Sequence, residues 1–184
     1  MNKDITSFHI TALFVISLML VILTGCVTSH TEIADITPAT VNTDCPATRQ
    51  IFTSSLNNFQ DIREKPHYYN KATRWRAKQQ LIKGQCEIWQ WSDHYSYVCS
   101  KVLPSEQAAK ELYQTAQQGL QQCMPSSAQG WTADSQPLKE NNGNKTNYQY
   151  NGKTMGSLTV IPDKTLIPRN WSVYFVIDSA INNK

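Results

Sequence analysis

The stretch QCEIWQWSDHYSYVCSKV, residues 85–102, decides the fold of this 184-residue chain. Apolar and aromatic residues alternate with polar ones on both sides of Ser92 and Asp93, a pattern typical of a β-hairpin with its turn at these two residues. Three cross-strand pairs follow from this turn: Cys86 with Cys99, Ile88 with Tyr97, and Gln90 with Tyr95. The other face of the hairpin then carries Trp89, Trp91, Ser96 and Val98. A slip of one residue in the register would exchange the two faces.

A helix is predicted on each side of this hairpin. The first begins at residue 44, with Thr43 or Asp44 as its cap and Pro46 in its first turn, where proline is tolerated. Its apolar stripe recurs at three- and four-residue steps: Ala47, Ile51, Ser55, Phe59 and Ile62. The second helix, residues 106–123, is capped by Ser105. It buries a similar stripe: Ala109, Leu112, Ala116, Leu120 and Cys123.

The C-terminal part of the chain reads as strands and loops. Residues 131–134 are a short strand, residues 137–145 an exposed loop, and residues 146–153 pair through Asn151-Gly152 with residues 156–162. Residues 170–179 are apolar on both faces and are predicted to be a central strand. The chain is therefore expected to form an α+β domain: an antiparallel sheet with two helices packed on one face, in the order α-β-β-α-β-β-β.

The N-terminus carries a targeting pattern. Lys3 precedes an uncharged apolar segment, residues 10–23, whose 14 residues are too few to cross a hydrocarbon core of about 30 Å as a helix. Thr24 and Gly25 are the small residues of a cleavage site, and Cys26 follows at once. The sequence LTGC, which ends at Cys26, resembles the lipobox of bacterial lipoproteins.

This resemblance implies three parts: residues 1–25 as the signal peptide, residues 26–43 as a lipidated Cys26 with a flexible tether, and residues 44–184 as one periplasmic domain. Several acyl chains, palmitate among them, hold such a protein durably at a membrane, whereas one chain binds only marginally. The alternative is an uncleaved anchor with a chance cysteine. Lipoproteins of this kind that stay at the inner membrane carry aspartate after the cysteine. Here Val27 follows, which indicates the periplasmic side of the outer membrane.

The other four cysteines are expected to form two disulfides, because the number is even and the compartment is oxidising. They lie at residues 45, 86, 99 and 123 and include no C-x-x-C pair. We predict that Cys45 at the start of the first helix joins Cys123 at the end of the second, and that Cys86 joins Cys99 across the hairpin. The alternative joins Cys45 to Cys86 and Cys99 to Cys123.

Residues 63–83 form a basic stretch whose only acidic residue is Glu64. In a cytoplasmic protein its cations and aromatic residues would indicate nucleic acid, but the signal peptide argues against that partner. We predict a surface for an anionic glycan, a lipid head group or an acidic protein; the alternative is a solvated basic surface beside a core tryptophan. The candidate binding residues, with two from the hairpin tip, are Arg63, Lys71, Arg74, Trp75, Arg76, Trp91 and His94. Trp75 and Trp91 are the tryptophans expected to be exposed, and Trp89, Trp131 and Trp171 those expected in the core.

The sequence carries no motif of an enzyme, a cofactor site or a metal site, since G-x-S-x-G, H-E-x-x-H, Walker A and G-x-G-x-x-G are all missing. Asp93 and His94 could form an acid–base pair, but both residue types are common in turns. We therefore expect no catalytic residue, no cofactor and no metal. The alternative is a small hydrolase whose site has no recognised motif.

The spacing C-x-I-W, Y-x-C, an alanine-rich helix that ends in cysteine, and W-x-V-x-F resembles small periplasmic domains, some of which neutralise toxins of neighbouring bacteria. No functional residue follows from this resemblance. The first hypothesis is a non-catalytic module that binds an envelope protein or polymer. The alternative is an immunity-type inhibitor that inserts residues 139–147 or 91–96 into an incoming hydrolase.

Overall fold

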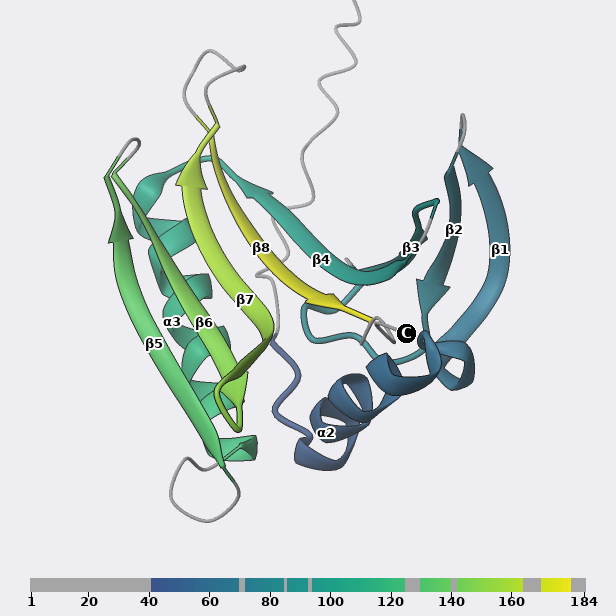
Figure 1. Cartoon of the computed structure of the whole chain (residues 1–184). Coiled ribbons are helices and arrows are strands. Elements are labelled where there is room, and N and C mark those ends of the chain that lie inside the picture. Colours follow the sequence, from purple (N-terminus) through teal and green to yellow (C-terminus); the bar gives the residue numbers. More distant parts are fainter. Residues whose placement is uncertain are drawn as a thin grey trace, which may run out of the picture. The chain divides into compact units, whose positions relative to one another are not determined.

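The computed structural model describes residues 41–69, 72–84, 86–92, 94–124, 130–139, 142–163 and 170–179. Within these ranges one antiparallel sheet has the strand order β1-β2-β3-β4-β8-β7-β6-β5, which can be followed in Figure 1. The strands are β1 (Arg63–Tyr69), β2 (Ala72–Ala77), β3 (Cys86–Gln90), β4 (Tyr95–Leu103), β5 (Trp131–Leu138), β6 (Gly143–Tyr150), β7 (Lys153–Pro162) and β8 (Trp171–Asp178). The helices are α2 (Cys45–Ser54) and α3 (Glu106–Cys123), with 3₁₀ turns η2 (Ser55–Asn57) and η3 (Gln60–Ile62). Cys26, the predicted signal peptide and most of the predicted tether lie outside the described residues.

The predicted fold class, α+β in the order α-β-β-α-β-β-β, is wrong. A single eight-stranded antiparallel sheet dominates the described chain, and four strands precede α3 where two were expected. The two additional strands, β1 and β2, come from the basic stretch. Strand β5 is longer than predicted, and most of the expected loop at residues 137–145 belongs to β5 and β6. None of the described helices is long and apolar enough to cross a bilayer.

The central hairpin has the predicted register. Strands β3 and β4 pair Cys86 with Cys99, Ile88 with Tyr97, and Gln90 with Tyr95. Ile88, Tyr97 and Cys99 are fully buried. We call their side of the sheet the core face, because it packs against α2 and α3. The opposite side is the distal face; Trp89, Ser96 and Val98 lie on it, as predicted.

Strands β1 and β2 form from residues that carry few of the usual strand signals. Pro66 has no backbone N–H to donate, which an edge strand tolerates, and β1 is at the edge of the sheet. The register shifts between Arg63 and Pro66, so the chain accommodates the proline at an irregularity. Strand β2 in turn pairs with β3, with Arg74 opposite Trp89 and Trp75 opposite Ile88.

Helix α2 ends earlier than its apolar stripe predicts. Asp44 stands at the N-cap without a side-chain hydrogen bond, and Pro46 is in the first turn. Asn58 and Phe59 then adopt positive φ values of 59° and 60°, which end the helical path. This reversal buries Phe59 completely, with its ring centroid 6.2 Å from that of Tyr97. The core contact of one aromatic ring thus outweighs continuation of the helix.

Helix α3 has the predicted bounds and the predicted cap, since the Ser105 hydroxyl accepts a hydrogen bond from the Ala108 amide at 3.2 Å. Its buried stripe faces β4, β7 and β8. The Tyr113 hydroxyl lies 2.5 Å from that of Thr146 on β6. Helix α2 covers the same face, because the Phe52 ring packs 6.0 Å from the Phe175 ring.

Both predicted disulfides are present. Cys45–Cys123 joins the start of α2 to the end of α3, with the Cα atoms 4.7 Å apart. Cys86–Cys99 joins the two strands of the central hairpin, and both of its sulfurs are on the core face. The residues before α2 are also part of the domain, since Val41 forms a β-bridge with Ile82. The N-terminal end of the domain is therefore tied to two distant segments.

The C-terminal strands confirm two further predictions. Asn151 and Gly152 have φ values of 50° and 78° and connect β6 to β7, as the Asn-Gly pair predicts. Strand β8 lies between β4 and β7 and is therefore central. Its core-facing side chains are all buried: Trp171, Val173, Phe175 and Ile177.

Candidate binding site on the distal face

The alternation of β1 and β2 divides the predicted binding residues between the two faces of the sheet. Arg74 and Arg76 lie on the distal face, where their Cα partners on β3 are Trp89 and Glu87. Trp75 points the other way and packs against the core. Lys71 lies outside the described residues. The basic stretch is therefore not one continuous binding surface.

Arg63 has a packing contact in place of the predicted exposed role. Its guanidinium carbon lies 4.4 Å from the ring centroid of Trp75 and 4.2 Å from that of Tyr95. The same guanidinium donates a hydrogen bond to the carbonyl oxygen of Asn58. Two aromatic faces and a carbonyl hold Arg63 in place, so Trp75 is covered and is not the exposed tryptophan that we expected.

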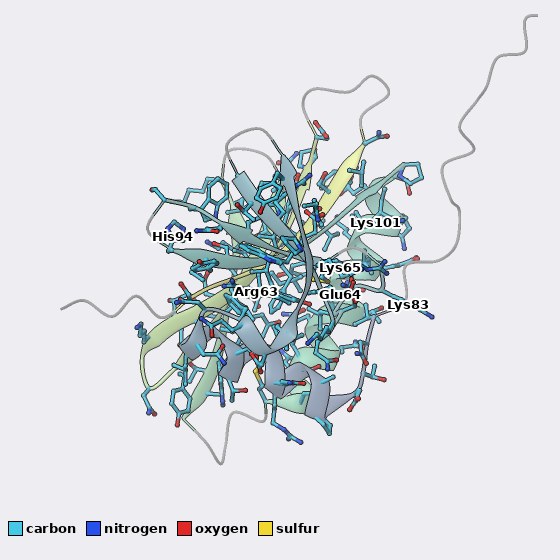
Figure 2. The ribbon with its side chains drawn as sticks, turned by 90° about the vertical axis from the view of Figure 1, so that its right-hand side faces the viewer. Arg63, Glu64, Lys65, Lys83, His94 and Lys101 are labelled. Carbon is cyan, nitrogen blue, oxygen red and sulfur yellow. A yellow bond between two sulfur atoms is a disulfide. The ribbon has the colours of Figure 1, made fainter. Side chains whose placement is uncertain are left out.

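The labelled charges lie apart in Figure 2. Arg63 and Lys65 lie near the centre of that view, Lys83 and Lys101 lie on one side of it, and His94 lies on the other. The labelled arginine and lysines are therefore not gathered around His94. A site near His94 must depend on neighbours other than the lysines.

The carboxylate of Glu87 is the centre of a hydrogen-bonded group on the distal face. Its Oε2 accepts from Arg74 Nη1 and from Trp89 Nε1, each at 3.1 Å. Its Oε1 lies 3.3 Å from His67 Nε2. The donors come from β1, β2 and β3, so Glu87 links three neighbouring strands. Charge-assisted hydrogen bonds of this kind fix the orientation of the groups that they join.

Aromatic rings extend from this group toward the hairpin tip. The ring centroids of Trp89 and Trp91 are 5.5 Å apart, and those of Trp91 and His94 are 6.2 Å apart with nearly parallel planes. The Arg74 guanidinium carbon lies 5.1 Å from the Trp89 centroid at the other end. We call these four side chains, Arg74, Trp89, Trp91 and His94, the aromatic row.

Hydrogen bonds hold both tryptophans of the row. Trp89 donates to Glu87, and Trp91 Nε1 donates to the Ser96 hydroxyl at 3.2 Å. Ser96 in turn donates to Asp178 Oδ1 at 2.6 Å, on the neighbouring strand β8. The orientations of the indoles are therefore set before any ligand arrives. Trp91 remains 43% exposed, so part of its ring is open to a partner.

A shallow cavity of about 240 Å³ adjoins the row on the distal face. Glu87 and Trp89 form one side of it, and Val98 and Ser100 of β4 form another. The site thus offers aromatic faces, an arginine and a carboxylate beside a small hollow. The described residues contain no cluster of three or more histidine, cysteine, aspartate or glutamate residues that could hold a metal ion.

Of the residues that the sequence proposed for binding, the structure brings Arg74, Trp91 and His94 together. The sequence did not propose the neighbouring His67, Glu87 and Trp89 for this role. Trp89 was expected in the core, although the hairpin register had placed it beside Trp91 on the opposite face. Glu87 could not be identified, because two of its three partners, His67 and Arg74, belong to strands that the sequence did not predict. One of the two segments proposed for the inhibitor spans residues 139–147. Its second half, residues 143–147, belongs to strand β6 and is not an exposed loop.

Comparisons with known proteins leave the site to be interpreted from its own geometry. No family model matches the chain, and no curated protein or solved structure is significantly similar to it.

Proposed function

We propose that this chain is a non-catalytic binding module of an outer-membrane lipoprotein, and that its distal face binds a glycan of the cell envelope. The observation that carries the proposal is the aromatic row, with both indole N–H groups already bonded to the protein. Aromatic faces pack against the C–H faces of sugar rings, and a tryptophan held in place loses little conformational entropy on binding.

The polar groups beside the row support a sugar ligand. Sugar hydroxyls need both donors and acceptors, and Arg74, His67 and Glu87 supply them next to Trp89. The arginine would also favour a glycan that carries carboxylate or phosphate groups. The membrane part of the proposal depends on the resemblance of LTGC, ending at Cys26, to a lipobox, which implies an envelope location.

The test is retention of the mature lipoprotein by purified peptidoglycan and by outer-membrane polysaccharide, measured by co-sedimentation. Trp91→Ala should weaken retention about tenfold or more, as loss of a central aromatic contact usually does. Tyr150→Ala is a matched control, because Tyr150 is 42% exposed but does not belong to the aromatic row. It should leave retention unchanged.

Salt separates the contributions to this binding. Stacking on Trp91 should persist at about 0.5 M salt, whereas the share contributed by Arg74 and Arg76 should fall as the charges are screened. Equal retention of the wild type and Trp91→Ala would overturn the proposal. A stoichiometric complex with a periplasmic hydrolase, with no glycan retention, would favour the inhibitor instead.

A further inference from the structure

The two edges of the sheet, β1 and β5 in Figure 1, differ in how open they are to another strand. Strand β1 is protected by Pro66, by the register irregularity beside it and by the exposed charges of Glu64 and Lys65. Strand β5 pairs with β6 over all eight of its residues without an irregularity. Its residues 132–137 are all exposed, and Asp134 is its only charged residue. A long, regular edge with so little charge favours pairing with a further strand.

One hydrogen bond fixes which backbone groups of β5 point away from β6. The Asn151 amide donates to the Gly130 carbonyl at 2.9 Å, and these two residues lie directly beside the first pair of the ladder, Trp131 with Tyr150. Hydrogen-bonded and non-hydrogen-bonded pairs alternate along an antiparallel ladder, so the even-numbered residues of β5 bond to β6. The backbone groups of the odd-numbered residues therefore point to the open edge: Trp131, Ala133, Ser135 and Pro137. Proline fits this set, because its missing N–H then leaves no gap in the β5–β6 ladder.

We infer that β5 pairs antiparallel with β5 of a second copy of this chain, with the two-fold axis of the dimer at Ala133. In this register Ala133 lies opposite itself, and Trp131 of each copy lies opposite Ser135 of the other. The N–H and C=O groups of these residues are then all bonded, in about six hydrogen bonds. Asp134 of each copy lies opposite Thr132 of the other, whose hydroxyl can donate to the carboxylate. The edge is thus complementary to itself in hydrogen bonds and in charge, which makes a second copy its partner.

The neighbouring registers of the same two strands are less favourable. An axis at Asp134 would place two carboxylates opposite each other, which destabilises the pairing. An axis at Ser135 would place Pro137 opposite Ala133, and proline lacks the N–H that this pair needs. The interface uses one edge of each copy and leaves only the protected β1 edges free, so the assembly closes at a dimer. Strand β5 contributes no residue to the aromatic row, so this inference and the glycan proposal can fail separately.

Cysteine cross-linking of the full mature lipoprotein, in vesicles of phosphatidylethanolamine and phosphatidylglycerol, tests the register. In Ala133→Cys the two Cα atoms should be about 5.5 Å apart, within the range of about 4.4 to 6.8 Å that a disulfide requires. Mild oxidation should therefore give a covalent dimer on a non-reducing gel. The control is Thr154→Cys, because Thr154 is exposed but belongs to β7, two strands from the edge, and it should stay monomeric. Equal cross-linking of the two variants, or stronger cross-linking of Asp134→Cys than of Ala133→Cys, would overturn the inference.

Charge variants of Thr132 test the same contact without a new covalent bond, by sedimentation equilibrium in non-ionic detergent. Thr132→Asp places a second carboxylate opposite Asp134 and should raise the dissociation constant of the dimer about threefold or more, whereas Thr132→Lys should lower it by about the same factor. The control Thr154→Asp lies in the same cross-strand row and should leave the constant unchanged. Thermal unfolding of each variant checks that the fold is intact.

Two results would overturn the inference. One is the same dissociation constant for Thr132→Asp and Thr132→Lys. The other is a chain that stays monomeric at every concentration, which would leave the edge of β5 to an extended segment of another protein.

Discussion

The two faces of the sheet use the same residue types for different purposes. On the core face, Phe52, Tyr97 and Phe175 are in edge-to-face contact and exclude water. On the distal face, Trp89 and Trp91 are in contact but stay partly exposed, and hydrogen bonds hold them instead of packing. The comparison teaches that aromatic content alone does not identify a core. What surrounds the ring decides whether it stabilises the fold or is available to a partner.

The largest loss of stability is expected from removal of the disulfides, both of which are on the core side. Removal of Cys45–Cys123, which closes a loop with a sequence separation of 78, by a double substitution to alanine should lower the free energy of unfolding by about 4 kcal/mol. The same change at Cys86–Cys99, with a separation of 13, should cost about 3 kcal/mol, because the loop is shorter. Denaturant unfolding measures both. A larger loss for the shorter loop would contradict the chain-entropy explanation.

Neighbouring residues on β8 give the next test. Phe175→Ala removes a fully buried ring from the core face and should cost about 3 to 5 kcal/mol. Val176→Ala, one residue further along the strand but on the distal face, should cost less than about 1.5 kcal/mol, because its side chain is only partly buried. Denaturant unfolding of the two variants measures both losses of stability. Similar losses would mean that the distal face is also part of the core.

A smaller effect is expected from one buried hydroxyl of the core face. The Tyr97 hydroxyl donates to the Gln79 carbonyl oxygen and accepts from the Leu81 amide, each at 3.0 Å. Burial raises the pKa of Tyr97, so the hydroxyl stays protonated over the usual pH range. Tyr97→Phe should cost about 1 to 3 kcal/mol, because two backbone groups lose their partner. The control Tyr174→Phe, on the distal face, should stay within about 0.5 kcal/mol of the wild type in thermal unfolding.

The smallest change in stability is expected at Glu87. This carboxylate is partly exposed, so Glu87→Gln should change the free energy of unfolding by less than about 1 kcal/mol. The substitution should nevertheless weaken glycan retention, since a neutral amide oxygen accepts more weakly from Arg74 and Trp89 than the carboxylate does, and the amide NH₂ cannot accept from His67. Co-sedimentation and thermal unfolding of the same preparation separate the two effects. Retention equal to the wild type would show that the orientation of these groups does not matter.

Local patterns in the sequence were enough to predict those elements that form from residues close together in the chain. The register of the β3–β4 hairpin followed from alternation around a turn, and α3 followed from its cap and its apolar stripe. The preferred disulfide pairing, one of two that the sequence left open, came from placing the cysteines on the hairpin and on the two helices, and it is confirmed. In each of these cases, propensity and burial favour the same structure.

The rest of the fold depended on contacts between distant segments. Strands β1 and β2 contain mostly charged and polar residues, and they are strands because β3 provides hydrogen-bond partners on one side. Helix α2 ends at Asn58 and Phe59 because the Phe59 ring is buried against Tyr97, which is far along the chain. The Glu87 group could not be predicted for the same reason, since two of its three donors are on the missed strands.

The bond between Cys45 and Cys123 also determines how the domain responds to mechanical load. Tension applied through the N-terminal segment acts first on the β-bridge between Val41 and Ile82. It then acts on the Cys45–Cys123 disulfide, which is a covalent link to the last turn of α3. Helix α2 therefore cannot be peeled from the sheet by a pull from that end. The force passes directly into α3, the longest helix of the described chain, and the domain should resist it as one body.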